Sequence, residues 1–241
     1  MFNQQFTTFT QQKSYPAFSL KAVFFDMDGV LFDSMPAHAE AWVRAIHRVG
    51  LPFTHYEAYM HEGRTGQGTI NGIFQRELGR DATEEERKSI YKHKSAEFEK
   101  LGEASPMSYA GKLLQMLKDK GLEIVLVTGS GQPSLLDNLE AHFPGIFTKE
   151  LMVTAFDVKY GKPHPEPYLM ALQKAKVAPW EAVVVENAPL GVEAAVGAGI
   201  FTVAVNTGIL EDKVLVDAGA NIVLAGMESL YKNWEKIFNN N

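Results

Sequence analysis

The stretch FFDMDGVLFDS, from Phe24 to Ser34, decides how this chain is expected to fold. The apolar run KAVFF, residues 21–25, is too short for an ordinary helix and is rich in aromatic and β-branched residues, which predicts a buried parallel strand. Asp26 and Asp28 follow at its carboxyl end, and Gly29 then breaks the pattern. In open α/β sheets, ligands bind at this edge.

Two carboxylates at this spacing leave the strand on the same side and repel one another unless a cation separates their roles. Mg²⁺ prefers carboxylate and carbonyl oxygens and accepts substrate phosphate as a further ligand. With such an ion, one Asp could attack phosphorus while the other, if protonated, gives a proton to the leaving oxygen. Taken alone, the pair also fits solvated residues of a turn or a helix cap.

Composition limits the classes to which the chain can belong. Its 241 residues are 46% apolar and 11% aromatic, enough for one sizeable core or for a core and a smaller domain. A net charge of −6 without a large basic cluster argues against nucleic acid as a partner. The absence of cysteine excludes disulfides and thiolate chemistry. No apolar run approaches the roughly 20 residues of a membrane helix, so no membrane contact is expected.

The first 19 residues are polar and rich in Gln and Thr, and we expect this segment to be flexible. The segment lacks the cationic start and the continuous apolar stretch of a signal peptide, so a cytoplasmic protein is expected. No part of the sequence indicates a protein partner, and we expect a monomer.

Helical periodicity fills the region after the first strand. Helices are predicted over 36–49, 69–78 and about 84–101, and nothing from 31 to 103 alternates like a strand. Further on, strands predicted at 122–128, 151–154, 182–187, 201–206 and 221–224 alternate with helices at 110–120, 133–142, 167–177 and 190–199 and with a closing helix. This pattern predicts a doubly wound, Rossmann-like α/β fold with a mainly parallel sheet. The α/β core would comprise 20–31 and 104–241, with a helical cap domain, 32–103, inserted after its first strand.

Other polar residues also follow predicted strands. Thr128 opens the sequence TGSG with Gly129 and Ser130, whose hydroxyl and N–H groups could hold phosphate oxygens. Lys162 lies in KYGKPHPEPY between Gly161 and a proline, where it would be a compact positive charge for a phosphoryl group.

Glu186 and Asn187 follow the strand AVVV as a metal-binding pair would. Individually these residues have simpler interpretations: Thr128 and Asn187 as helix caps, and Lys162 as a solvated loop charge. Their occurrence in order on successive strand ends is hard to assign to chance.

The ordered set DMDGV, TGS, GKPHPEPY and VENAPLG resembles the haloacid dehalogenase superfamily of aspartate-based phosphotransferases, over residues 21–237. The nearest subgroup is the β-phosphoglucomutase-like phosphatases and mutases, and the helical insertion matches members with a small α-helical cap. The resemblance implies that Asp26 is the nucleophile, which becomes an aspartyl phosphate. It implies that Asp28 is the general acid and base, with its carbonyl reaching Mg²⁺, and that Thr128 and Lys162 bind phosphate.

Glu186 and Asn187 fall where this superfamily has two acidic residues near Mg²⁺. Asn187 brings no charge, so another carboxylate would have to compensate. In the cap loop HEGRTGQG, Glu62 is expected to close onto Mg²⁺ over a small substrate, and Arg64 to pair with a substrate anion. Glu62 could instead be a solvated loop acid. His38 matches a histidine that orients the acid and base residue in mutase-like relatives, or it is a helix-end histidine bonded to backbone.

Three functions remain open at this point. The leading one is a Mg²⁺-dependent phosphohydrolase that acts on a small phosphorylated metabolite or on inorganic pyrophosphate through an aspartyl phosphate. A sugar phosphomutase would need two anion sites, and the cap loop offers only Arg64. A catalytically silent binding protein would account for Asn187, although Asp26, Asp28 and Lys162 are all present.

Overall fold

A computed structural model describes residues 2–130 and 135–238 of the chain. Six parallel strands form one sheet in the order β3-β2-β1-β4-β5-β6. The strands are β1 Ala22–Phe25, β2 Glu123–Val127, β3 Met152–Val153, β4 Ala182–Glu186, β5 Phe201–Val205 and β6 Ile222–Leu224. Each lies where the sequence predicts a strand. Because β1 pairs with β2 on one side and with β4 on the other, the residues that follow β1 reach the middle of the sheet's carboxyl edge.

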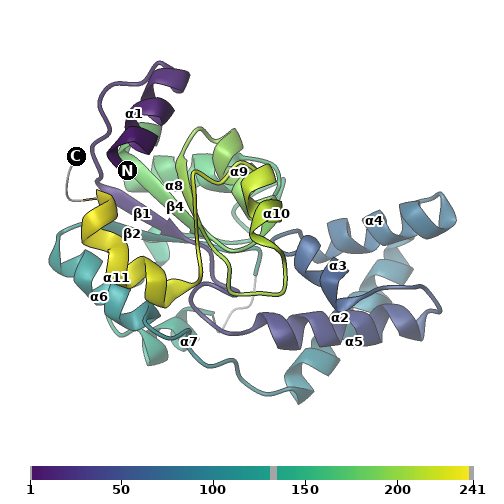
Figure 1. Ribbon diagram of the computed structural model, residues 1–241. Helices are drawn as coiled ribbons and strands as arrows, with labels where there is room; N and C mark the ends of the chain where they lie inside the picture. Colours follow the sequence, from purple (N-terminus) through teal and green to yellow (C-terminus); the bar gives the residue numbers. More distant parts are fainter. Residues whose placement is uncertain (1, 131–134, 239–241) are drawn as a thin grey trace.

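Helices cover both faces of the sheet (Figure 1). They are α1 Phe2–Lys13, α6 Ala110–Asp119, α7 Leu135–His142, α8 Glu166–Ala175, α9 Pro189–Gly197, α10 Asp212–Asp217 and α11 Met227–Phe238, with the short 3-10 helices η1 Lys149–Leu151 and η2 Pro179–Glu181. Val23 and Phe25 pack in the layer of α6 and α11, whereas Ala22 and Phe24 pack with α8 and α9. Successive side chains of a strand point to opposite faces, so burial on both faces explains the unbroken apolar run of β1. The predicted doubly wound α/β fold is confirmed.

Four consecutive helices lie between β1 and α6, and we call residues 35–100 the helical insertion. They are α2 Met35–Arg48, α3 His55–Met60, α4 Gly66–Leu78 and α5 Glu84–Lys100. Figure 1 shows them extending to one side of the sheet. The helices enclose their own apolar core, against which Leu210, from the segment after β5, also packs. Helix α3 was not predicted, because six residues are too few to show helical periodicity.

The N-terminal segment is not the flexible stretch that its composition predicts. Residues 2–13 form α1, in which Phe6 and Phe9 are buried. Phe6 stacks on Phe201 of β5 with ring centroids 4.2 Å apart, and Phe9 meets the same ring edge-on at 5.4 Å. Residues three positions apart share one face of a helix. Two aromatic side chains therefore anchor an otherwise polar segment to the sheet.

Two predictions fall on residues outside the described parts of the chain. These are the helix start at Pro133 and the last glycine of TGSG, Gly131; α7 is described from Leu135 onward. Within residues 2–130 and 135–238, no helix combines the length and the apolar character that crossing a bilayer requires.

Candidate active site

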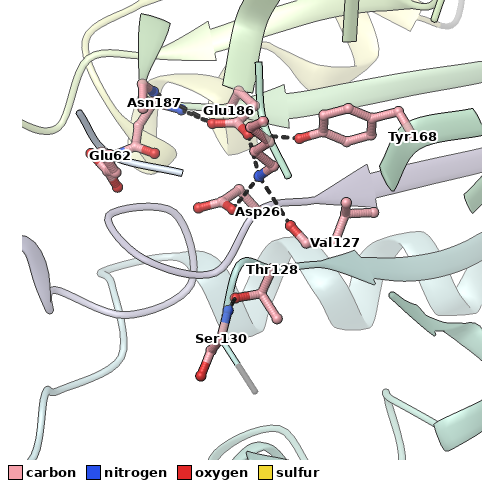
Figure 2. Close-up of polar contacts among 10 residues, drawn as sticks. Asp26, Glu62, Val127, Thr128, Ser130, Tyr168, Glu186 and Asn187 are labelled. Carbon is pink, nitrogen blue, oxygen red and sulfur yellow. Dashed lines mark hydrogen bonds and ion pairs between the residues drawn. The ribbon is translucent and has the colours of Figure 1, made fainter. Parts of the chain in front are cut away.

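Asp26 and Lys162 meet at the centre of the sheet's carboxyl edge. The N–H of Asp26 donates to the carbonyl of Val185 at 3.1 Å, which extends the pairing of β1 with β4 by one residue. Lys162 Nζ donates to Asp26 Oδ1 at 2.5 Å, to Glu186 Oε1 at 2.6 Å and to the Val127 carbonyl at 3.1 Å (Figure 2). All three N–H groups of this ammonium are therefore used, by acceptors at the ends of three neighbouring strands.

Burial and neighbouring charges shift the pKa of both partners. Burial raises the pKa of Asp26 to about 8, with Glu186 and Asp28 adding to the rise and Lys162 opposing it. Burial by itself would lower the pKa of Lys162, but the carboxylates of Asp26 and Glu186 outweigh it and hold that pKa above its usual range. The site contains more acidic groups than Lys162 can neutralise, which favours binding of a further cation.

Asp28 is held by two groups that favour its ionised form. The hydroxyl of Ser34 donates to Asp28 Oδ1 at 2.5 Å, and His38 Nε2 lies 3.3 Å from the same oxygen. Burial alone would raise the pKa of Asp28, but His38 and Ser34 outweigh it and lower that pKa to about 2. His38 therefore contacts the second aspartate of the pair and is not simply bonded to backbone.

Lys94, on α5, is a member of this site that the sequence analysis missed. Its Nζ lies 2.7 Å from His38 Nδ1, and the imidazole stacks on Phe98 with ring centroids 4.1 Å apart. Burial lowers the pKa of Lys94 to about 8. An ammonium that donates to Nδ1 leaves the Nε2–H of His38 free to donate to Asp28. One sequence signal could have identified Lys94. It is spaced four residues from both Ile90 and Phe98, which places it on the packed face of its helix.

Glu62 reaches the core from the helical insertion. It is 8% exposed, and the side-chain amide of Asn187 donates to its Oε1 at 3.0 Å and to its Oε2 at 3.2 Å (Figure 2). Burial raises the pKa of Glu62 well above its ordinary value, and the charges of Asp26 and Glu186 add to this effect. Glu62 is therefore not a solvated loop acid but part of the acidic cluster, and its approach to Mg²⁺ stays a prediction.

Gly63 sets how deeply the loop of the helical insertion enters the site. Its φ is +81°, and a Cβ at this position would lie 3.0 Å from Lys162 Cδ. A Cβ at Gly129 would lie 3.4 Å from the Gly63 carbonyl oxygen. Glycine at positions 63 and 129 allows the loop to approach Lys162 and the turn after β2 closely.

The turn after β2 contains the predicted phosphate-binding residues. Thr128 is buried, and its Oγ1 accepts from the N–H of Ser130 at 3.0 Å. Figure 2 places Thr128 and Ser130 on the opposite side of Asp26 from Asn187. The structure thus brings Thr128, Gly129 and Ser130 to the same edge of the sheet as Asp26.

Arg64 is not brought to this cluster. Its side chain lies along the start of α4, where its Cγ would be 2.9 Å from a Cβ at Gly68 and its Nη1 3.1 Å from a Cβ at Gly72. Burial lowers the pKa of His61 to about 4, and the charge of Arg64 contributes to this shift. The side chain of Arg64 packs along α4, and its pairing with a substrate anion stays a prediction.

The carboxylate of Glu186 is already occupied by protein donors. Its Oε1 accepts from Lys162 and from the hydroxyl of Tyr168 at 2.7 Å, and its Oε2 accepts from the N–H groups of Asn187 at 3.1 Å and Ala188 at 3.4 Å. Four donors fill the lone-pair positions of a carboxylate. The predicted metal-ligand role of Glu186 therefore does not fit these contacts, which make it the anchor of Lys162.

A mixed set of oxygen donors fits Mg²⁺ better. Within the described parts of the chain, no three His, Cys, Asp or Glu side chains are grouped so as to hold a metal ion by themselves. However, Asn187 Oδ1 is buried without a hydrogen-bond partner, and it belongs to the same cluster as the carboxylates of Asp26 and Glu62. An orphaned amide oxygen beside acidic groups is a suitable donor for a hard cation.

Comparison with known proteins finds a family model and relatives that match most of the chain. Residues 20–199 match a model of haloacid dehalogenase-like hydrolases. A solved structure from Bacteroides vulgatus, provisionally named a beta-phosphoglucomutase, is 55% identical, with a TM-score of 0.95 over 99% of this chain and 97% of its own.

Two further relatives carry different activity names. The phosphorylated carbohydrates phosphatase of Thermotoga maritima is 33% identical over 210 residues, which cover 83% of this chain and 92% of the relative. The beta-phosphoglucomutase of Bacillus subtilis is 26% identical over 227 residues, which cover 90% and 96%. Similarity over nearly the full length of these relatives includes the helical insertion as well as the sheet.

Proposed function

Because the chain belongs to the haloacid dehalogenase-like hydrolase family, we propose that it hydrolyses a small phosphorylated metabolite or inorganic pyrophosphate through an aspartyl phosphate on Asp26. It is an enzyme of the phosphatase type, in a group that also contains mutases. The proposal rests on the hydrogen bond from Lys162 to Asp26. Glu62, an acid supplied by the helical insertion, lies in the same acidic cluster. We propose that the insertion is a cap over this site.

In the first step, a carboxylate oxygen of Asp26 forms a bond to phosphorus while the bond from phosphorus to the leaving oxygen breaks. The ammonium of Lys162 offsets charge on the transferred group. The turn formed by Thr128, Gly129 and Ser130 offers N–H and hydroxyl groups to its oxygens. The leaving oxygen takes a proton from Asp28.

Asp28 enters this cycle ionised, because its pKa is lowered to about 2. It must therefore gain a proton before the first step: as His38 Nε2, 3.3 Å away, passes its proton to Asp28, His38 Nδ1 takes one from the ammonium of Lys94, 2.7 Å away. In the second step, the ionised Asp28 takes a proton from water as the water oxygen attacks phosphorus and Asp26 is released. The low pKa suits this second role.

Mg²⁺ would be held by Asp26, the backbone carbonyl of Asp28, Asn187 and Glu62. When bound, the ion would supply positive charge to the phosphoryl oxygens and to the acidic cluster. Glu62 would replace the charge that Asn187 does not bring, so the two residues act as a pair.

The close approach of the insertion loop favours a small substrate. Glu62 contacts Asn187, and Gly63 lies against Lys162, so little room is left beyond the transferred phosphoryl group. Inorganic pyrophosphate, whose leaving group is a single phosphate, fits this limit better than a large ester. The acid of Glu62 would also oppose a second anion on the substrate unless a cation lies between them.

The relatives named as phosphoglucomutases make a sugar phosphomutase the second candidate. A mutase must hold a sugar bisphosphate while that intermediate reorients in the site, and this requires a second anion-binding site on the cap. Arg64 packs against α4 instead of facing the core, which argues for hydrolysis.

The test is release of phosphate from inorganic pyrophosphate and from a panel of sugar phosphates and other esters, with Mg²⁺ and with EDTA. We expect release that depends on Mg²⁺ and is abolished in Asp26→Asn. Acid-stable, hydroxylamine-sensitive label on the protein after rapid quenching would identify the aspartyl phosphate. Conversion of glucose 1-phosphate to the 6-phosphate faster than phosphate appears would replace this proposal with the mutase.

A further inference from the structure

Tyr168 lies behind the catalytic lysine, where no substrate can reach it. It belongs to α8, is fully buried, and donates its hydroxyl to Glu186 Oε1 at 2.7 Å (Figure 2). Lys162 Nζ lies 5.2 Å from the centre of its ring, within the range of a cation–π contact. One aromatic side chain therefore contacts both the catalytic ammonium and the carboxylate that anchors it.

The carboxylate of Glu186 fits a tightly limited space. A Cβ at Gly191, at the start of α9, would lie only 1.9 Å from its Oε1, so the absence of a side chain there makes room for the carboxylate. The N–H groups of Asn187 and Ala188 hold the other oxygen. The Tyr168 hydroxyl is the donor that fixes Oε1 from the side away from Asp26.

The position of the Glu186 carboxylate determines how the ammonium group of Lys162 is oriented. An ammonium has three N–H groups arranged around one axis. The Val127 carbonyl and Glu186 take two of them, which leaves the third aimed at Asp26. If Glu186 turns, the ammonium can follow it, and its hydrogen bond to the nucleophile lengthens.

We infer that Tyr168 is a positioning residue, which holds Glu186 so that the ammonium of Lys162 faces the carboxylate of Asp26. The kinetic consequence rests on the phosphate-releasing reaction proposed above. The hydroxyl of Tyr168 donates to Glu186, and its ring faces Lys162, so it is expected to contribute to the chemical step and not to substrate binding. Such a residue changes kcat and leaves KM nearly unchanged.

The experiment compares Tyr168→Phe with the parent enzyme, measuring kcat and KM for phosphate release under saturating Mg²⁺. Phenylalanine keeps the ring and removes only the hydroxyl. We expect kcat to fall about tenfold, the size of a lost hydrogen bond to a charged group, with KM within about twofold. Tyr160→Phe is the matched control, because the Tyr160 hydroxyl is half exposed and makes no hydrogen bond within the described residues. An unchanged kcat, or a rise in KM alone, would overturn the inference.

A double-mutant cycle tests whether Tyr168 acts through Glu186. In a Glu186→Ala background, the Tyr168→Phe change should alter kcat less than about twofold, because the acceptor of the Tyr168 hydroxyl is already gone. A full tenfold effect in that background would show that Tyr168 acts by another route and would refute the inference.

A third measurement does not depend on turnover. In a ¹⁵N-edited spectrum of lysine ammonium groups, the signal of Lys162 is assigned by its loss in Lys162→Met. We expect Tyr168→Phe, or Glu186→Gln if the first variant does not fold, to shift or broaden that signal, whereas Tyr160→Phe leaves it in place. If the parent enzyme releases no phosphate from any substrate, the proposed function fails. In that case this spectrum decides the inference about Tyr168, with an unmoved signal counting against it.

Discussion

The side-chain amide of Asn187 donates to both carboxylate oxygens of Glu62, at 3.0 and 3.2 Å, and this contact joins the α/β core to the helical insertion. Each residue is unusual by itself: Asn187 is an amide where the motif resemblance predicts an acid, and Glu62 is an acid on a loop expected to face an anionic substrate. Their contact accounts for both, because the carboxylate supplied by one side offsets the charge missing on the other. Because the helical insertion supplies this acid in place of the α/β core, metal binding would depend on closure of the insertion over the core.

Glu62→Gln is therefore expected to raise the Mg²⁺ concentration for half-maximal activity by about tenfold or more, since the amide removes one negative charge from the ion's surroundings. The same change should raise the melting temperature of the metal-free protein, because it removes a buried acid from a cluster of like charges. Activity titrated with Mg²⁺ and thermal unfolding in EDTA measure the two effects. Glu99→Gln, an exposed acid of the same insertion, is the control. An unchanged Mg²⁺ requirement would remove Glu62 from the metal site.

Without metal, the free energy of unfolding should fall as pH rises from about 5 to 8. Burial raises the pKa of Asp26 to about 8, so over this range the folded state holds a proton that the unfolded state has released. The raised pKa of Glu62 acts in the same direction. A group with a raised pKa stabilises less as pH rises, by on the order of 1 kcal/mol per pH unit for Asp26. Urea unfolding in EDTA at several pH values measures the slope. Asp26→Asn should reduce it, and saturating Mg²⁺ should flatten it; equal slopes for all three samples would contradict the assignment.

Lys162→Ala should destabilise the protein by about 3–5 kcal/mol, because it leaves the buried carboxylates of Asp26 and Glu186 without their common cation. Phosphate release should fall by at least about a thousandfold, as expected when a preorganised charge at the transferred group is lost. Lys159→Ala, in the same segment but exposed, should change neither quantity. Urea unfolding and phosphate release on the same samples provide the comparison.

Lys94→Met should remove an alkaline limb from the pH–rate profile. The pKa of Lys94 is lowered by burial to about 8, so the parent enzyme loses this ammonium, and with it the donor to His38 Nδ1, as pH rises through about 8. In the variant, kcat should be lower by about tenfold or more near pH 7 and should change little between pH 7 and 9. A decline near pH 8 that persists in the variant would assign that limb to another group.

Phe6→Ala should lower the free energy of unfolding by about 3–5 kcal/mol, the usual cost of removing a buried aromatic side chain. The exposed neighbour Thr8→Ala should have an effect within about 0.5 kcal/mol. Phosphate release at a temperature where both variants are folded should match the parent, since α1 packs far from the carboxyl edge that carries Asp26. A negligible change for Phe6→Ala would restore the original prediction of a loosely held N-terminus.

The order of the elements and the chemistry of the core edge could be predicted from the sequence. Buried parallel strands appear in the sequence as short apolar runs. The residue directly after each run must lie at the carboxyl edge of the sheet. The positions of Asp26, Thr128 and Glu186 follow from this local rule alone. The short helix α3 did not follow, because six residues are too few to show helical periodicity. The anchoring of α1 did not follow, because it depends on contacts with distant parts of the chain.

The partners of these residues were decided only by tertiary structure. The cap-loop motif predicts Glu62 at the metal site, but no local pattern indicates its hydrogen bonds with Asn187, 125 positions further along, or the contact of Lys94 with His38. Nor does a local pattern indicate that the Glu186 carboxylate accepts from four donors or that Arg64, in the loop before α4, packs along that helix. A sequence fixes which chemical groups are available and at which strand end they appear, because these follow from short-range periodicity. Which group holds which depends on packing between the insertion and the core, where burial sets the charge that each group can carry.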